Sequence, residues 1–180
     1  MDYGRHRRIY RYQKKGEHKM KIYHGSIEQV TAPEIRLSDR TLDYGNGFYA
    51  TTSHAQAERW VRRRIRENKV DVGYVNIYEF DPQTMQTYNT ISFSTPTEEW
   101  VDFVMANRMQ KGFTHDYDIV YGPVANDHVY TAFALYEGNI ISKQALIAEL
   151  RTYTLVDQYL FHTERALSSL RFIKAEEVRI

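Results

Sequence analysis

Two short motifs constrain the fold of this chain most strongly. The first, Tyr23-His24-Gly25-Ser26, is typical of a short strand that ends in a polar turn. The second, Tyr44-Gly45-Asn46-Gly47-Phe48-Tyr49, is typical of a glycine-containing loop that leads into another strand. Glycine lets a flat ligand approach the main chain where a β-carbon would block it. The motifs therefore predict a cleft in which an imidazole, a phenol and backbone amides surround a nucleotide-sized, hydroxyl-rich ligand.

The rest of the chain mixes strand and helix patterns without strict alternation, which predicts an α+β fold. We expect strands over residues 21–26, 47–51, 73–80, 85–93, 117–124, 157–163 and 170–178, with a further short strand over 34–37. We expect helices over 55–68, 127–137 and 142–151, a helix that starts within 95–99 and reaches Arg108, and a turn or short helix over 164–169.

Two of these helices carry start signals. Ser53 is a good N-cap for the helix over 55–68, and Pro96 followed by two glutamates is typical of a first helical turn. The segment 62–66 contains four arginines. We interpret it either as a solvated helix face, which is the more usual role of such a run, or as a binding patch.

Length and composition limit the class of protein. The 180 residues suffice for one compact domain. The absence of cysteine excludes disulfides and thiolate metal sites. No apolar run has the length of a membrane span, and no secretory segment follows the start. We therefore expect a single domain over 20–180, located in the cytoplasm and without membrane contact.

The charge is concentrated at the start of the chain. The formal net charge is +1, yet residues 1–19 hold seven Lys or Arg against two acidic residues. We interpret this basic extension as a partly disordered, solvated segment, which is the usual state of a charge run. The alternative is an arm that binds nucleic acid through phosphates and aromatic stacking.

Three segments together resemble a known family. Tyr23–Ser26, Gly45–Tyr49 and the late segment Asp157–His162 are similar to the His, Tyr and Glu motifs of the diphtheria-toxin and poly(ADP-ribose) polymerase branch of the ADP-ribosyltransferases. The chain also resembles, from Met20 nearly to its end, a bacterial domain family of unknown function, DUF3990, placed in the same superfamily. The resemblance implies a split β-sheet with flanking helices that binds NAD.

The resemblance also implies roles for individual residues. His24 would hydrogen-bond the adenine-side ribose, the backbone of Gly25 would pair with the nicotinamide amide, and Tyr49 would stack on the nicotinamide ring. Trp60 is the candidate for a second stacking aromatic, with a core tryptophan as the alternative interpretation. The other predicted cofactor contacts are Ser26, Arg36 and Gly47.

Gln158 occupies the late position at which the best-known members carry glutamate. A neutral amide can hold the ribose 2′-hydroxyl but cannot stabilise positive charge on the sugar as a carboxylate does. One such polar group can change the rate by roughly 10²–10³, so Gln158 favours transfer of a single ADP-ribose over chain growth. Glu164 and Glu79 are weaker candidates for a substitute carboxylate.

Other titratable groups show no functional pattern. His54, His115 and His128 share no metal-ligand spacing with acids or with each other, so we expect no metal site. Asp157 and His162, which lie near Gln158, are predicted to be structural.

The leading hypothesis is an NAD-dependent mono-ADP-ribosyltransferase that modifies an intracellular protein or nucleic acid, as the toxin of a toxin–antitoxin or defence pair with an antitoxin partner. One alternative is a catalytically degenerate domain that binds NAD or ADP-ribose, as Gln158 would allow. The other is a nucleic-acid-binding module that uses the basic extension and residues 62–66, with steeply salt-dependent affinity.

Overall fold

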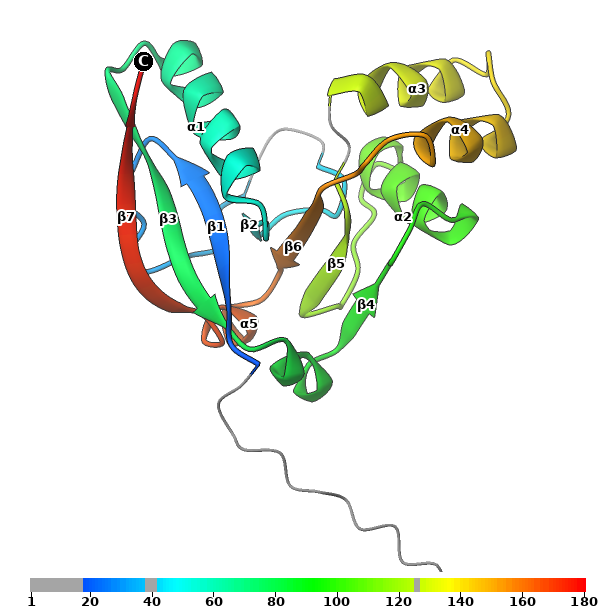
Figure 1. Cartoon of the computed structure of the whole chain (residues 1–180). Helices are drawn as coiled ribbons and strands as arrows, with labels where there is room; N and C mark the ends of the chain where they lie inside the picture. Colours follow the sequence, from blue (N-terminus) through cyan, green and yellow to red (C-terminus); the bar gives the residue numbers. More distant parts are fainter. Residues whose placement is uncertain (1–17, 38–41, 125–126) are drawn as a thin grey trace, which may run out of the picture.

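The strands of the computed structural model, which describes residues 18–37, 42–124 and 127–180, form two sheets (Figure 1). The first sheet is antiparallel, with the order β1 (Met20–Ser26), β3 (Val72–Phe80), β7 (Arg171–Arg179). The second has the order β2 (Phe48–Ala50), β6 (Asp157–Phe161), β5 (Ile119–Pro123), β4 (Thr90–Ser92), and β4 runs parallel to β5.

Helices cover one face of each sheet (Figure 1). The first sheet packs against α1 (His54–Asn68), and the second packs against α2 (Glu98–Met109), α3 (Asp127–Glu137) and α4 (Lys143–Leu150). The 3-10 helix η1 (Pro82–Thr87) and the short α5 (Glu164–Leu167) lie near the ends of strands. The mixed α+β class predicted from the sequence is confirmed.

Three apolar clusters hold these layers together. One lies under α1 and includes Val61 and Val75. A second lies between the two sheets, where Ile22 and Tyr78 of the first meet Phe161 of the second. The third fills the space between the second sheet and α2–α4. Because each sheet is covered on both faces, the position of a residue within its strand decides which cluster it joins.

The edges of the two sheets meet at β1 and β2. Tyr23 and Thr51 form an isolated antiparallel bridge, with Tyr23 N donating to Thr51 O at 2.8 Å and Thr51 N donating to Tyr23 O at 3.0 Å. This bridge makes the two sheets continuous at one point. It therefore determines which residues of β1 and β2 face the same side.

Most predicted elements are present, with local exceptions. Ser53 and Thr97 cap α1 and α2, and Pro96 precedes the cap of α2 instead of lying in its first turn. No strand forms over 34–37. The predicted strand over 85–93 is largely wrong, because Asp81 caps η1 by accepting from Gln83 N at 2.9 Å and only the three residues of β4 are extended.

Residues 1–17 lie outside the described residues, so only the last two residues of the predicted basic extension, 18 and 19, are described. Lys19 forms an ion pair with Glu79. In the part of the chain that is described, no helix has both the length and the apolar character needed to cross a membrane.

The Tyr44 hydroxyl joins three elements inside the third cluster. It donates to Pro123 O at 2.7 Å and accepts from Trp100 Nε1 at 2.8 Å, so it connects the glycine loop to β5 and α2. Both Tyr44 and Trp100 are fully buried. Buried polar groups of this kind are costly to leave without a partner.

We therefore expect Tyr44→Phe to lower the free energy of unfolding by about 2–4 kcal/mol, because both partners lose their hydrogen bond. Tyr88→Phe is the matched control, since its hydroxyl makes one exposed contact of 3.4 Å, and we expect a change within about 0.5 kcal/mol. Chemical denaturation of the two variants measures the difference, and equal losses would contradict the expectation.

Candidate functional site

The Tyr23–Thr51 bridge brings three predicted site residues onto one face. Continuing its antiparallel register places Gly25 level with Tyr49. Tyr49 pairs with Leu160, and Gln158 lies two residues before Leu160 on β6. Paired residues share a face and strand residues alternate with period two. Gly25, Tyr49 and Gln158 therefore face the same side, which is the side covered by α1 and by α2–α4.

Helix α1 lies directly against Gly25. A β-carbon at Gly25 would lie 2.5 Å from Ala57 O and 3.2 Å from Trp60 Cδ1, so only glycine fits here. Trp60 is 41% exposed. The interpretation of Trp60 as a core tryptophan is therefore wrong: its indole lies beside Gly25, and Arg63 Cζ lies 5.5 Å from its ring centroid.

The backbone of Gly25 also points toward the junction. Tyr23 directs its N–H and C=O toward Thr51, and strand residues direct these groups to alternate edges. The N–H and C=O of Gly25 are therefore aimed at the same edge of β1 as those of Tyr23. A donor and an acceptor side by side at an open sheet edge can pair with a planar amide.

His24 lies on the opposite face, behind the site. Its Nδ1 lies 2.6 Å from Tyr49 O, and its ring centroid lies 4.3 Å from that of Phe48. Burial lowers the pKa of His24 to about 4, with a further lowering by the charge of Arg36, although the bond to Tyr49 raises it. Since a carbonyl only accepts, Nδ1 carries the proton, and neutral His24 keeps Nε2 as an acceptor.

Tyr49 is held by the glycine loop. Its hydroxyl donates to Gly45 O at 2.6 Å and accepts from Tyr44 N at 3.2 Å. Gly47 has φ +147°, and a β-carbon there would lie 2.5 Å from Phe161 O. Glycine at this position therefore allows the loop to pack closely on β6.

Gln158 is 8% exposed and lies beside the buried Tyr44 hydroxyl, whose pKa is raised by burial. Its Nε2 makes no hydrogen bond to the residues that the structure describes. An amide donor buried without a partner is uncommon in folded proteins. Gln158 therefore has a buried amide next to the Tyr44 hydroxyl, on the face shared with Tyr49 and Gly25.

Ser26 and Arg36 are engaged locally. Ser26 Oγ accepts from Glu28 N at 3.1 Å, and Arg36 pairs with Glu28 at 2.9 Å and Glu34 at 2.8 Å while its side chain stays 62% exposed. Arg36 lies near enough to His24 to affect its pKa, so a ligand beside His24 would be within the reach of an exposed cation.

The alternative carboxylates do not join this group. Glu79 pairs with Lys19 and Arg171, each at 2.7 Å, and these ion pairs hold its pKa at about 2. Glu164 is exposed in the first turn of α5. Glu79 pairs with Lys21, four residues along β1 from Gly25, and Glu164 lies on α5, so neither carboxylate is next to Gly25, Tyr49 or Gln158 in the strand pairing.

Sequence patterns missed Asn76, which is fully buried between the sheets. Its Oδ1 accepts from Val30 N at 2.8 Å, and its Nδ2 donates to Glu28 O at 3.1 Å and to His24 O at 3.4 Å. Asn76 thereby fixes the turn that follows the first motif. A polar residue inside an apolar strand was the available signal.

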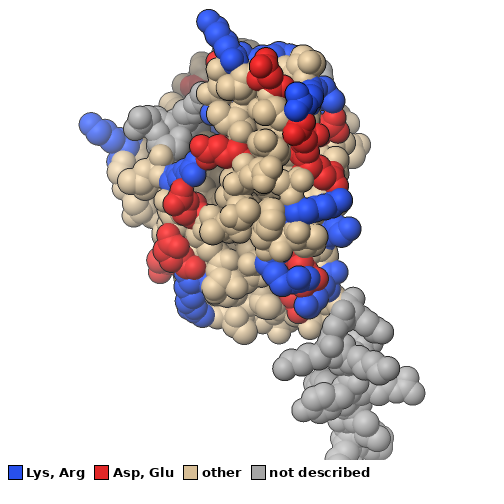
Figure 2. Space-filling view, turned by 90° about the vertical axis from the view of Figure 1, so that its left-hand side faces the viewer, with Lys and Arg blue, Asp and Glu red and all other residues tan. Residues whose placement is uncertain are grey.

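The arginine-rich segment of α1 is largely neutralised. Arg62 pairs with Glu58, and both Arg63 and Arg64 pair with Glu67. Figure 2 views the molecule from the side on which β7 lies in Figure 1, and charges of both signs are interleaved there. These ion pairs favour the solvated-face interpretation over a nucleic-acid patch.

Two pockets lie next to this region. One, of about 430 Å³, is bordered by Gly45, Asn46, His115 and His162. The other, of about 600 Å³, is bordered by Thr52, Gly122 and Asp157. Asp157 directly precedes Gln158 in the sequence. Within the described ranges, no group of three or more His, Cys, Asp or Glu residues could hold a metal ion.

The lowered pKa of His24 makes stability depend on pH. Between pH 6.5 and about 4 the unfolded chain binds a proton at His24 that the folded chain does not, so stability falls as the pH falls. Carboxylates with lowered pKa, such as Glu79, act in the same direction.

We therefore compare the wild type with His24→Asn, which removes the imidazole that binds this proton. The wild type should lose up to about 3 kcal/mol more than the variant over that pH range. Denaturant titrations at several pH values measure both curves, and parallel curves would show that burial of His24 does not control its protonation.

A family model described as a protein of unknown function (DUF3990) matches residues 20–172. No curated protein and no solved structure matches the chain. The matched region contains all the residues assembled above and covers most of the chain. The chain therefore belongs to the DUF3990 family.

Proposed function

We propose that this protein is an NAD-dependent mono-ADP-ribosyltransferase built on an ADP-ribosyltransferase-like split β-sheet. One observation carries the proposal: Gly25, Tyr49 and Gln158, far apart in sequence, share a face at the junction of two sheets. Trp60 lies beside Gly25 on the same side. The sequence motifs also nominate His24, which lies on the opposite face of β1 with its Nδ1 2.6 Å from Tyr49 O.

The nicotinamide end of NAD suits this arrangement. Its carboxamide would pair with the edge N–H and C=O of Gly25, and its ring would lie between the aromatic side chains of Tyr49 and Trp60. Trp60 is 41% exposed, and Tyr49 is half-buried. Stacking on aromatic rings contributes beyond the area that it buries.

In the proposed reaction the bond between the ribose C1′ and the nicotinamide nitrogen breaks, and nicotinamide leaves with the electron pair. A nucleophile of the acceptor bonds to C1′ and loses its proton. Gln158 would hold a ribose hydroxyl, and Nε2 of neutral His24 would accept a hydrogen bond from the adenine-side ribose. The neutral amide of Gln158 favours transfer of a single unit.

The acceptor would be a protein or a nucleic acid, and the setting a toxin–antitoxin or defence pair. This part of the proposal rests on the resemblance of the three motifs to ADP-ribosyltransferases. Arg36, exposed near His24, is the candidate contact for an NAD phosphate.

The test is incubation of the full chain with labelled NAD and a cell lysate. We expect label on a macromolecule and release of nicotinamide by the wild type. His24→Ala and Tyr49→Ala should each reduce release by about 100-fold, since His24 would position the adenine-side ribose and Tyr49 the nicotinamide ring of the bound NAD. Tyr49→Phe keeps the aromatic ring and should retain activity within about tenfold.

Circular dichroism and thermal unfolding establish that each variant is folded. Wild-type protein that neither releases nicotinamide nor transfers label would argue against the proposal. Equal activity of Tyr49→Ala and Tyr49→Phe would argue against stacking by this ring.

A second candidate function is NAD or ADP-ribose binding without turnover, which the amide at Gln158 favours. It predicts that NAD raises the melting temperature of the wild type while no nicotinamide appears. Gln158→Glu would then create turnover, because a carboxylate can stabilise positive charge on the ribose. Chromatographic detection of nicotinamide tests this, and a Gln158→Glu variant that binds NAD but stays inactive would contradict it.

A further inference from the structure

We propose that Asp157 is a positioning residue for the NAD site, an inference that rests on the proposed function above. Asp157 is the first residue of β6 and directly precedes Gln158. Because neighbouring strand residues point to opposite faces, its carboxylate lies on the face away from Gln158. Asp157 therefore acts through its neighbours and not on NAD itself.

The Asp157 carboxylate accepts four hydrogen bonds from other segments. Oδ1 accepts from Thr52 N at 2.9 Å and from Thr51 Oγ1 at 3.3 Å. Oδ2 accepts from Thr52 Oγ1 at 2.7 Å and from Tyr121 OH at 3.3 Å. Hydrogen bonds to an ionised acceptor are about twice as strong as neutral ones, so this carboxylate holds its partners firmly.

The segments held by Asp157 are those that carry the proposed site. Thr51 and Thr52 directly follow β2, which carries Tyr49, and they directly precede Ser53, the N-cap of α1, which carries Trp60. Thr51 also forms the backbone bridge to Tyr23, the neighbour of His24. One carboxylate thus connects the strand of Gln158 to the junction between β2, which carries Tyr49, and α1, which carries Trp60.

Four donors around one carboxylate are more than strand pairing requires. The β5–β6 ladder already includes the pair formed by Pro123 and Asp157. The additional hydrogen bonds to Asp157 fix the position of the segment between β2 and α1 relative to β6. A displacement of about 1 Å in such an arrangement can reduce a reaction rate by about 100-fold.

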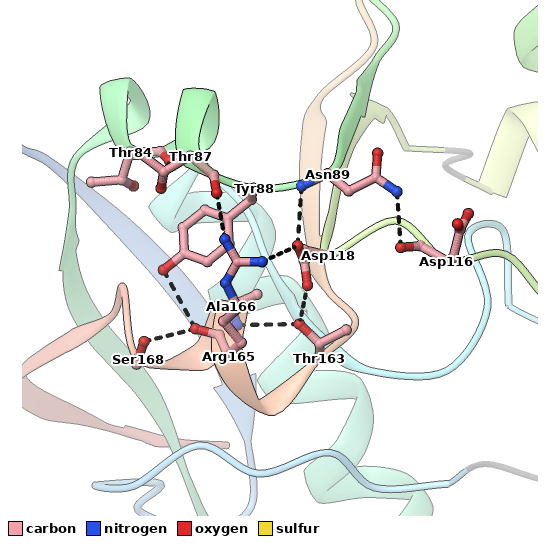
Figure 3. A network of polar contacts seen from close by, with 10 residues as sticks. All are labelled: Thr84, Thr87, Tyr88, Asn89, Asp116, Asp118, Thr163, Arg165, Ala166 and Ser168. Atoms are coloured by element: carbon pink, nitrogen blue, oxygen red, sulfur yellow. Dashed lines mark hydrogen bonds and ion pairs between the residues drawn. The ribbon is translucent and has the colours of Figure 1, made fainter.

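Asp118 offers a matched control at the other end of the same strand pair (Figure 3). It is buried, its Oδ1 accepts from Thr163 Oγ1 at 2.6 Å, and its Oδ2 accepts from Asn89 N at 3.0 Å. Arg165 Nη1 lies 3.5 Å from Oδ2. These partners carry none of the proposed NAD contacts, so loss of Asp118 should affect stability alone.

The experiment compares Asp157→Ala, Asp157→Asn and Asp118→Ala in the full chain. We expect Asp157→Ala to lower kcat for nicotinamide release by about 10- to 100-fold and to weaken NAD binding by less than about fivefold, because misplaced groups affect the transition state most. Asp157→Asn, which keeps an acceptor for Thr52 N, should recover much of the loss. Asp118→Ala should keep kcat within about twofold below its melting temperature.

Hydrogen–deuterium exchange supplies a readout that does not depend on turnover. Residues 49–53 should exchange faster in Asp157→Ala than in the wild type and in Asp118→Ala. If Asp157→Ala does not fold, Thr52→Val is the second variant to test. It keeps the carboxylate and removes the hydroxyl that donates to Asp157 Oδ2, so it should lower kcat by a smaller factor.

The outcomes separate the two proposals. If the wild type neither binds nor cleaves NAD, the proposed function fails and this inference fails with it. If the wild type cleaves NAD while Asp157→Ala keeps its kcat, or loses no more than Asp118→Ala does, the inference alone is overturned. A loss confined to Asp157 variants, with faster exchange over 49–53, supports it.

Discussion

Two backbone hydrogen bonds between Tyr23 and Thr51 are the constraint on which the candidate site depends. They join the edge of one sheet to the edge of the other, and their register decides which residues face which side. A shift of one residue would exchange the faces of an entire strand. It would then be His24, and not Gly25, that lies level with Tyr49.

Around this junction, polar atoms of the site residues hold the segments in position. The hydroxyl of Tyr49 is bound to Gly45 O, and its carbonyl faces His24 Nδ1. Burial keeps His24 neutral, so one ring nitrogen holds the strand and the other remains an acceptor. Gln158 differs, since its buried amide nitrogen has no partner among the described residues.

The central strand pair of the second sheet, β5 and β6, has a carboxylate at each end. Asp118 holds the end of this strand pair that lies near α5 and η1. Asp157 holds the other end, next to the segment that joins β2 to α1. Charges elsewhere on the described surface pair locally along α1, β3 and β7. These two carboxylates thus hold segments together, whereas the surface ion pairs contribute little stability.

The sequence by itself determined the α+β class and most helix and strand positions, and it nominated the residues of the candidate site. The Ser53 cap and the periodicity of apolar residues are local signals, readable without tertiary contacts. The segment 85–93 was mispredicted because capping by Asp81 outweighed its strand pattern. Only the tertiary structure decided that Trp60 is exposed beside Gly25, that Asn76 fixes the turn after His24, and that Asp157 joins β6 to the start of α1. Each of these facts depends on contacts between residues far apart in the chain, which local patterns do not encode.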